Sequence, residues 1–392
     1  MKDYWQETTE SKINKKKIII SIIISILIIG IIIIVSLYIT NKNVREWIDT
    51  NIFRKQVTQN NVSIIELDEG QTSNIYAFNK YIGILNKNKL NIYGNAGNKE
   101  AEMDIQITNP IFNSSNRFLT IAESKGQKIY LIEDKQVVWE NSIEGNIAQV
   151  HVNENGYVAV IISDTSYKSV IEIFDPKGNE LFKRFLSTTM AVDVSISNDN
   201  KYLAIAEVNP SGTVIQSNIR IISIEKAKTD PANSEEKNYA SEANRLITNV
   251  NYQNKNKLVC MYTDGITMIE NDAETNLFDN KDKKITLESI ELNNNVATVE
   301  EKSSGIFSAD SVINIVNIEN KSTKEYTVNS VIKEFYTKGD IIALNLGTEI
   351  EFINTGGWLV KRYIANQEIT NITVGNNIAG IIYRDKVEIV NL

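Results

Sequence analysis

Short alternating strands separated by polar turns fill the chain from Val62 onward. Their repeating unit is an apolar pair, a small or β-branched residue and further apolar residues, as in Lys201–Ala206. Eight copies of this unit are centred on Gly83, Thr120, Ala159, Ala204, Val259, Ala297, Ala343 and Ala379. Neighbouring centres lie about 42 residues apart on average, and a period of roughly 40–45 residues made of short strands is typical of β-propeller blades.

Each repeat divides into four strands, and the third repeat gives the clearest case. Asn-Gly and Asp-Pro-x-Gly turns supply the fixed or positive φ at which the chain reverses. The predicted strands of this repeat are Ala148–Val152, Tyr157–Ile162, Val170–Phe174 and Glu180–Phe185. The pattern predicts an all-β propeller of eight blades. Seven blades remain the alternative if the long interval between the fourth and fifth centres contains an irregular pairing.

The eighth repeat has only three strands, the last being Lys386–Val390. A further apolar strand, Val62–Leu67, precedes the first complete repeat. We predict that residues 62–67 pair with residues 385–391 as the missing outer strand, because this pairing closes the ring and removes an exposed strand edge.

The longest interruption between strands is the polar segment 225–244 in the fourth repeat. Large apolar residues are nearly absent from it. A connection of this length is either functional or disordered, and its composition favours disorder.

An uncharged stretch near the N-terminus, Ile18–Ile39, predicts a transmembrane helix. Its 22 residues include 14 isoleucines, and a helix of this length spans about 33 Å, enough for a bilayer core of roughly 30 Å. A cleaved signal peptide would have a shorter apolar region and small residues at a cleavage site. We therefore expect an uncleaved single-pass anchor in the cell membrane.

The flanking charges predict the orientation of the anchor. Lys15, Lys16 and Lys17 precede the span, whereas only Lys42 and Arg45 follow it closely. The positive-inside rule places residues 1–17 in the cytoplasm as a short tail and the rest of the chain outside it. Aromatic residues gather at membrane interfaces, so Tyr38 and Trp47, together with the three lysines, are the predicted interface residues.

Residues 40–60 are expected to link the anchor to a propeller of residues 61–392. Val44, Trp47, Ile48 and Ile52 follow the spacing of one helix face. The segment is therefore predicted to be a short amphipathic helix, either on the outer membrane surface or extending the anchor and packing against the propeller.

Composition excludes several kinds of chemistry. Cys260 is the only cysteine and His151 the only histidine, so no intramolecular disulfide, no multi-histidine zinc site and no serine–histidine mechanism without His151 is possible. Phosphate-binding glycine loops and calcium loops are absent from the sequence, so we predict no cofactor and no metal. Residues 56–392 include 44 acidic and 32 basic residues, and this net negative charge argues against nucleic acid as a partner.

Each inner strand carries a polar residue 8–11 positions before its motif centre. These candidate ligand-binding residues are Asn74, Asn109, Gln149, Asp193, Asn249, Ser289, Lys333 and Asn371. Their side chains either bond backbone groups where the chain crosses between blades or form a polar ring at one mouth of the channel. Asp193 and Lys333 are the charged members of the set.

The four-strand repeats resemble those of the WD40-like and quinoprotein-like propeller superfamilies. The whole plan also resembles a membrane-anchored propeller family of low-GC Gram-positive bacteria. That plan consists of a basic tail, an isoleucine-rich anchor, the segments Trp47–Asp49 and Phe53–Lys55, and a propeller. The resemblance implies the fold and the anchoring but no established activity.

The sequence leaves three functions open. The leading one is a non-catalytic extracytoplasmic module that binds or scaffolds an envelope protein or a cell-wall ligand. The second is a hydrolase that acts on envelope glycans through paired carboxylates. The third is a sensor whose anchor helix contacts a signalling partner in the membrane.

Overall fold

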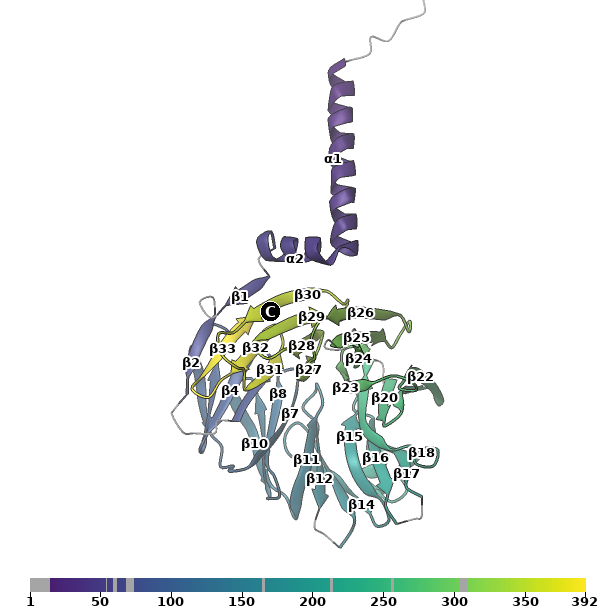
Figure 1. Cartoon of the computed structure of the whole chain (residues 1–392). Helices are drawn as coiled ribbons and strands as arrows, with labels where there is room; N and C mark the ends of the chain where they lie inside the picture. Colours follow the sequence, from purple (N-terminus) through teal and green to yellow (C-terminus); the bar gives the residue numbers. More distant parts are fainter. Residues whose placement is uncertain are drawn as a thin grey trace, which may run out of the picture. The chain divides into compact units, whose positions relative to one another are not determined.

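The computed structural model describes residues 15–53, 55–58, 62–67, 74–163, 166–211, 214–254, 257–303 and 309–392. The chain forms two compact units, one up to Gln56 and the other from Val57 to Leu392. The second unit contains eight antiparallel sheets, one for each predicted repeat, and is an eight-bladed β-propeller (Figure 1).

Eight inner strands, one per blade, form the wall of the ring and contact one another in sequence order. They are β3 (Asn74–Phe78), β7 (Pro110–Ser115), β11 (Asn146–Val152), β15 (Met190–Ile196), β19 (Ile247–Gln253), β23 (Ile285–Leu292), β27 (Glu334–Lys338) and β31 (Asn371–Gly375). The second strands follow after tight turns. They are β4 (Tyr81–Asn86), β8 (Phe118–Glu123), β12 (Val158–Ser163), β16 (Tyr202–Asn209), β20 (Lys257–Tyr262), β24 (Asn295–Ser303), β28 (Ile341–Asn345) and β32 (Ile378–Ile382).

The third and outer strands complete each blade. The third strands are β5 (Lys89–Tyr93), β9 (Lys128–Glu133), β13 (Ser169–Phe174), β17 (Gln216–Ser223), β21 (Gly265–Glu270), β25 (Ala309–Asn317), β29 (Glu349–Asn354) and β33 (Lys386–Asn391). The outer strands of blades one to seven are β6 (Lys99–Asp104), β10 (Gln136–Ser142), β14 (Glu180–Leu186), β18 (Glu235–Ala240), β22 (Ala273–Asp279), β26 (Thr323–Val328) and β30 (Leu359–Ile364).

The outer strand of the eighth blade comes from the other end of the propeller sequence, as predicted. β2 (Ser63–Glu66) pairs antiparallel with β33, with Ser63 opposite Ile389 and Glu66 opposite Lys386. Figure 1 shows β2 beside the yellow C-terminal strand. A further short strand, β1 (Gln56–Thr58), lies next to β30 in the sheet of blade seven.

The hydrophobic core consists of eight layers, each between two consecutive blades. Alternation along the second strands produces this arrangement, since successive side chains point to opposite faces of a strand. In blade three, Val158 and Val160 pack toward blade two, whereas Ala159 and Ile161 pack toward blade four. Every blade therefore buries both faces, which explains the nearly continuous apolar runs of the second strands.

In seven blades the motif centre faces the following blade. The eighth differs by one residue, because Ala379 packs toward blade seven and Gly380 faces blade one. A Cβ atom at Gly380 would lie 3.0 Å from the Thr373 side chain and 3.3 Å from that of Ile82. The predicted centre at Ala379 was therefore wrong by one position, and glycine occupies the equivalent site in this blade, where a Cβ atom would be tightly packed.

The expectation of disorder in segment 225–244 was wrong. Three of the four residues of helix α3 (Ile224–Ala227) and the whole outer strand β18 lie within it. The composition of this segment gave a wrong prediction because β18 is a polar strand at an exposed edge. Ion pairs with neighbouring side chains stabilise it. Arg220 bonds Glu235 and Glu207, and the ammonium of Lys237 lies 2.9 Å from a carboxylate oxygen of Asp272.

The first unit contains α1 (Lys15–Thr40) and α2 (Lys42–Asn51). Within α1, residues Ile20–Thr40 are long and apolar enough to cross a membrane. Trp47 is 60% exposed on α2. The side chains of Lys15, Lys16 and Lys17 lie outside the described part of the structure, as does the tail before them.

A polar contact joins the two helices. The Tyr38 hydroxyl donates to the Asp49 carboxylate at 2.8 Å, and the Lys55 ammonium lies 2.8 Å from the same carboxylate. Asp49 is buried, so its charge needs these partners. Tyr38 thus has a contact within the protein as well as its predicted place at the membrane interface.

Candidate ligand-binding cavity in the central channel

Eight inner-strand residues occupy equivalent places in the ring, which we call the ring positions. Each lies directly opposite the small or β-branched residue of its blade that faces the following blade. The ring positions are Tyr76, Asn113, His151, Ser195, Asn251, Ser289, Tyr336 and Thr373.

Five ring positions form a hydrogen bond to the equivalent residue of the next blade. In each case the partner is the residue immediately after the ring position of that blade. Three accept from a backbone N–H, one donates to a carbonyl and one bonds a hydroxyl. The pairs are Asn113 with Val152 (2.9 Å), Ser195 with Tyr252 (3.0 Å), Thr373 with Ala77 (2.7 Å), Asn251 with Ile290 (2.9 Å), and Ser289 with Thr337. These bonds fix the rotation of neighbouring blades, because a buried backbone group left without a partner is costly.

The three aromatic ring positions, Tyr76, His151 and Tyr336, depart from this rule. Tyr76 packs against Phe112 with ring centroids 3.8 Å apart and ring planes tilted by 57°, and its hydroxyl has no partner in the described structure. The Tyr336 hydroxyl donates to Asn371 at 2.5 Å. The His151 imidazole makes no hydrogen bond with any described residue.

The predicted site residues lie on the inner strands or just before them, but at several levels of the channel. Ser289 is a ring position, and five others lie two residues before one: Asn74, Gln149, Asp193, Asn249 and Asn371. Lys333 and Asn109 precede their strands. The spacing in sequence misaligned Asn109, Ser289 and Lys333 with the other five, because hairpins differ in length and, in blade six, a bulge lies between Ser289 and the turn.

Asp193 and Asn249 come together across the junction of blades four and five. The Asp193 carboxylate accepts from the Val250 N–H at 2.9 Å and from the Asn249 amide at 3.4 Å. Burial raises the pKa of Asp193 to about 7, and the nearby negative charge of Glu291 acts in the same direction. Asp193 therefore joins blades four and five.

The other predicted residues make separate contacts. Lys333 is exposed and pairs with Glu368 at 3.2 Å, and Asn371 accepts from Tyr336. Gln149 and Asn109 are exposed, and Asn74 is half-buried. The structure thus places these residues toward the start of the inner strands without gathering them into one cluster.

A cavity of about 560 Å³ occupies the opposite end of the channel. The ends of the inner strands and the turns after them line it, with contributions from blades two to eight. Nine asparagines and one glutamine are among the lining residues. The ring positions Asn113, His151, Ser195 and Asn251 lie on its floor, and the turns form its rim.

Side-chain amides form hydrogen bonds between rim turns of neighbouring blades. Asn153 donates to Asn200 at 2.6 Å and to the Ser197 carbonyl at 3.2 Å, which joins blades three and four. Gln253 donates to the Ile290 carbonyl at 2.9 Å and to that of Asn295 at 3.2 Å, which joins blades five and six. Because these bonds link separate blades, the rim presents its polar groups in fixed positions.

One cation reaches the cavity floor. The ammonium of Lys338, the last residue of β27, donates to the carbonyl oxygen of Ser114 in blade two. His151 belongs to blade three, opposite blade seven in a ring of eight. Burial and the charge of Lys338 lower the pKa of His151 to about 4, so the imidazole is neutral at physiological pH.

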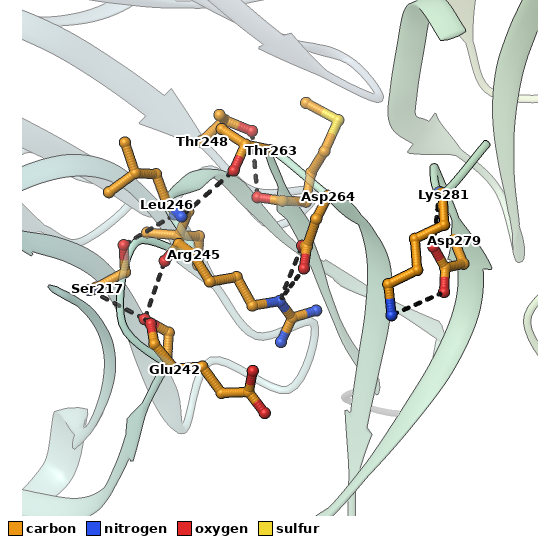
Figure 2. Close-up of polar contacts among 12 residues, drawn as sticks. Ser217, Glu242, Arg245, Leu246, Thr248, Thr263, Asp264, Asp279 and Lys281 are labelled. Atoms are coloured by element: carbon orange, nitrogen blue, oxygen red, sulfur yellow. Dashed lines mark hydrogen bonds and ion pairs between the residues drawn. The ribbon is translucent and has the colours of Figure 1, made fainter. Parts of the chain in front are cut away.

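A second polar cluster lies where the chain passes from blade four to blade five (Figure 2). The Arg245 guanidinium donates to Asp264 at 2.9 Å and stacks over the Tyr262 ring at 3.9 Å. The Ser241 hydroxyl and the Ser217 hydroxyl bond the backbone of the same connection. These contacts fasten a connection and converge on no cavity, so we assign them a structural role.

The sequence identified His151 only by its uniqueness and missed most of the ring positions and Lys338. The hairpin turns could have identified the ring positions. Residues of the two strands can be matched in pairs by counting away from the turn, and this places each ring position opposite its motif centre. Among the described residues, no group of three or more His, Cys, Asp or Glu side chains is arranged to hold a metal.

Solved β-propellers resemble this chain in fold. BamB from Moraxella catarrhalis has a TM-score of 0.50 and 13% identity, with 84% of this chain and 99% of BamB covered. Dihydro-heme d1 dehydrogenase NirN has a TM-score of 0.52 and 11% identity, with 85% and 76% covered. The β-propeller domain of Cps50 (Swd1) from Myceliophteria thermophila has a TM-score of 0.45 and 11% identity, with 84% and 99% covered. Identities this low support a shared fold only.

No curated protein matches the sequence. A family model does match residues 52–392, from the end of α2 through the last blade. The chain belongs to DUF5711, a family of unknown function.

Proposed function

We propose that this protein is a membrane-anchored binding module whose propeller lies outside the cytoplasm and holds a polar ligand of the cell envelope in its central cavity. The observation that carries the proposal is the cavity of about 560 Å³, whose amide side chains come from six blades, with Asn153 and Gln253 among those that bond a neighbouring blade. Its size falls in the range of roughly 300–1,000 Å³ that is typical of small-ligand sites.

The chemistry of the lining favours a slender, hydroxyl-rich or amide-rich ligand over a flat protein surface. Carboxamides both donate and accept, so they complement hydroxyl and amide groups without a net charge. A segment of a cell-wall polymer has this character, and an envelope protein would have to insert a polar loop. Pre-fixed polar groups also lower the ordering cost of binding.

Membrane attachment is the second part of the proposal. It rests on the apolar helix Ile20–Thr40 and on the lysines before it, which favour a cytoplasmic N-terminus. The same plan in membrane-anchored propellers of low-GC Gram-positive bacteria is consistent with a protein of the cell envelope.

Cosedimentation with purified cell-wall sacculi tests the binding role. The full-length chain in lipid nanodiscs should cosediment, and Asn293→Trp on the cavity rim should reduce the bound fraction at least fivefold. Lys177→Trp, an exposed change on the turn between β13 and β14, is the matched control and should bind as the unaltered chain does. Equal binding by both variants would place any ligand elsewhere on the propeller.

One observation favours a hydrolase as the second candidate function. Burial raises the pKa of Asp193 to about 7 with a contribution from the negative charge of Glu291, and two neighbouring carboxyl groups can act as acid and base in glycan hydrolysis. Release of reducing ends from sacculi, abolished by Asp193→Asn, would support this candidate. Binding without release would leave the binding module as the function.

A further inference from the structure

The Lys338 side chain joins two blades that are not neighbours. Lys338 ends the inner strand of blade seven, and its ammonium donates to the Ser114 carbonyl in blade two. Ser114 is the residue that the ring position of blade one, Tyr76, would bond if it followed the rule of the other blades. Since Tyr76 packs against Phe112 instead, the Ser114 carbonyl is available to Lys338.

Among the described residues, Lys338 is the only lysine or arginine that lines the cavity. Within the described residues, its ammonium has no carboxylate at ion-pair distance. The carboxylates that line the cavity, Glu154, Glu291 and Asp340, are on exposed parts of the rim. His151 beside Lys338 is neutral near pH 7, so Lys338 carries the one positive charge that the described residues place at the floor.

An ammonium group has three donors, and one carbonyl is weak compensation for a charge that is partly removed from water. Charges in such places normally have a counter-charge. Lys338 has no negatively charged partner at the floor, and the amides above it are neutral. A ligand that is polar along its length and negatively charged at one end would complement both.

We propose that Lys338 binds a monoanionic group, a carboxylate or a phosphodiester, of a hydroxyl-rich ligand held by the amides of the cavity. This inference rests on the proposed function and deepens it by naming the charge of the ligand. The three rim carboxylates and the single lysine argue for one negative charge, because a second would face repulsion without a partner.

Matched probes test this inference. N-acetylmuramic acid and N-acetylglucosamine share a sugar ring and differ by a lactyl carboxylate, while diglycerol phosphate and glycerol differ by a phosphodiester. Isothermal titration of the full-length chain in nanodiscs should give at least tenfold tighter binding for one or both anionic probes than for the neutral counterparts. The two anionic probes distinguish the source of the charge.

Substitutions assign the preference to Lys338. Lys338→Met should abolish the difference between anionic and neutral probes, and Lys338→Arg should retain most of it because the charge remains. Lys281→Met is the matched control, since Lys281 is 82% exposed on the turn after β22 and is not among the residues that line the cavity. Figure 2 shows Lys281 beside Asp279. Melting temperatures of all variants show whether the propeller stays folded.

The outcomes separate the inference from the proposed function. Equal affinity for anionic and neutral probes, or an anion preference that survives Lys338→Met, overturns the inference while cavity binding stands. Failure of all four probes to bind also overturns it, and the sacculus experiment then judges the binding role independently. An anion preference lost in Lys338→Met and kept in Lys338→Arg confirms the inference.

Discussion

Ile65 of β2 lies directly opposite Val387 of β33, in the strand pair that closes the ring. Ile65 is 5% exposed and packs in the layer between blades eight and one, whereas its neighbour Ile64 is 44% exposed. Closure of the propeller therefore depends on a four-residue strand that is separate in sequence from the blade it completes.

Removal of the closing strand should destabilise the whole propeller. A chain that begins at residue 58 should be soluble and unfold cooperatively, whereas one that begins at residue 70 should aggregate or melt far lower. The shorter chain loses several backbone hydrogen bonds worth roughly 0.5–1.5 kcal/mol each and the burial of Ile65, worth roughly 1.5–3 kcal/mol. Thermal unfolding by circular dichroism measures the difference, and equal melting temperatures would mean that β2 does not close the ring.

A point substitution separates the closing strand's packing from its length. Ile65→Ala should lower the free energy of unfolding by roughly 2–5 kcal/mol, as for other buried Ile→Ala changes. Ile64→Ala removes the same atoms from an exposed position and should cost less than about 1 kcal/mol.

Loss of the Thr373 hydroxyl should lower the stability of the propeller. Its hydroxyl accepts from the Ala77 N–H at 2.7 Å, across the junction of blades eight and one. Thr373→Val keeps the shape but leaves that N–H without its acceptor, so we expect a loss of roughly 1–3 kcal/mol in denaturant unfolding. Thr373→Ser keeps the hydroxyl and should recover much of the loss. Equal loss in both variants would show that packing, not the hydrogen bond, matters here.

His151 should remain neutral through the physiological pH range. Its pKa is lowered to about 4 in the folded protein, so the unfolded chain binds a proton between about pH 6.5 and pH 4 that the folded chain does not. The stability linked to His151 is therefore present above pH 6.5 and lost as the pH falls toward 4. Because the chain has one histidine, its nitrogen NMR signals need no further assignment in a protein carrying a histidine-free tag. A midpoint near 6.5 would contradict the buried, neutral state.

Asp193 should make the propeller less stable as the pH rises. Its pKa is raised to about 7 by burial, so the folded protein holds a proton between about pH 4 and pH 7 that the unfolded chain releases. The linked stability is present below about pH 4 and lost as the pH rises through 7. Asp193→Asn keeps an acceptor for Val250, so its melting temperature relative to the unaltered protein should rise from pH 4 to pH 8.

Glu172 requires a parallel measurement, because burial also raises its pKa to about 7. Glu172→Gln should remove a separate contribution to the dependence of the melting temperature on pH. A constant melting-temperature difference between Asp193→Asn and the unaltered protein at every pH would show that Asp193 does not titrate in this range.

The membrane topology is testable with intact protoplasts. Protease added outside should remove the propeller and leave the N-terminal tail protected, because the lysines precede the span. A propeller that stays membrane-bound and fully protected would show the reverse orientation. Detergent-treated protoplasts, in which both parts become accessible, provide the control.

The blade plan was predictable because it depends on local patterns. Each second strand must bury both faces, so an apolar run such as Val158–Ile162 recurs with its own turn signals in every blade. The closing role of residues 62–67 was predictable for a related reason: a three-stranded last repeat and an unassigned first strand are complementary. The polar strand β18 was not predictable, because ion pairs with other blade strands hold it rather than its own composition.

By itself, the sequence determined the eight blades, the closing strand, the apolar N-terminal helix and the lack of histidine and cysteine for metal or disulfide chemistry. Only the tertiary structure decided which polar side chains share a level of the channel, because bulges and unequal hairpins change the offset between sequence and height. It also decided that Lys338 meets Ser114 beside His151. Those residues come from blades seven, two and three, and a closed ring brings together strands whose separation along the chain carries no local signal.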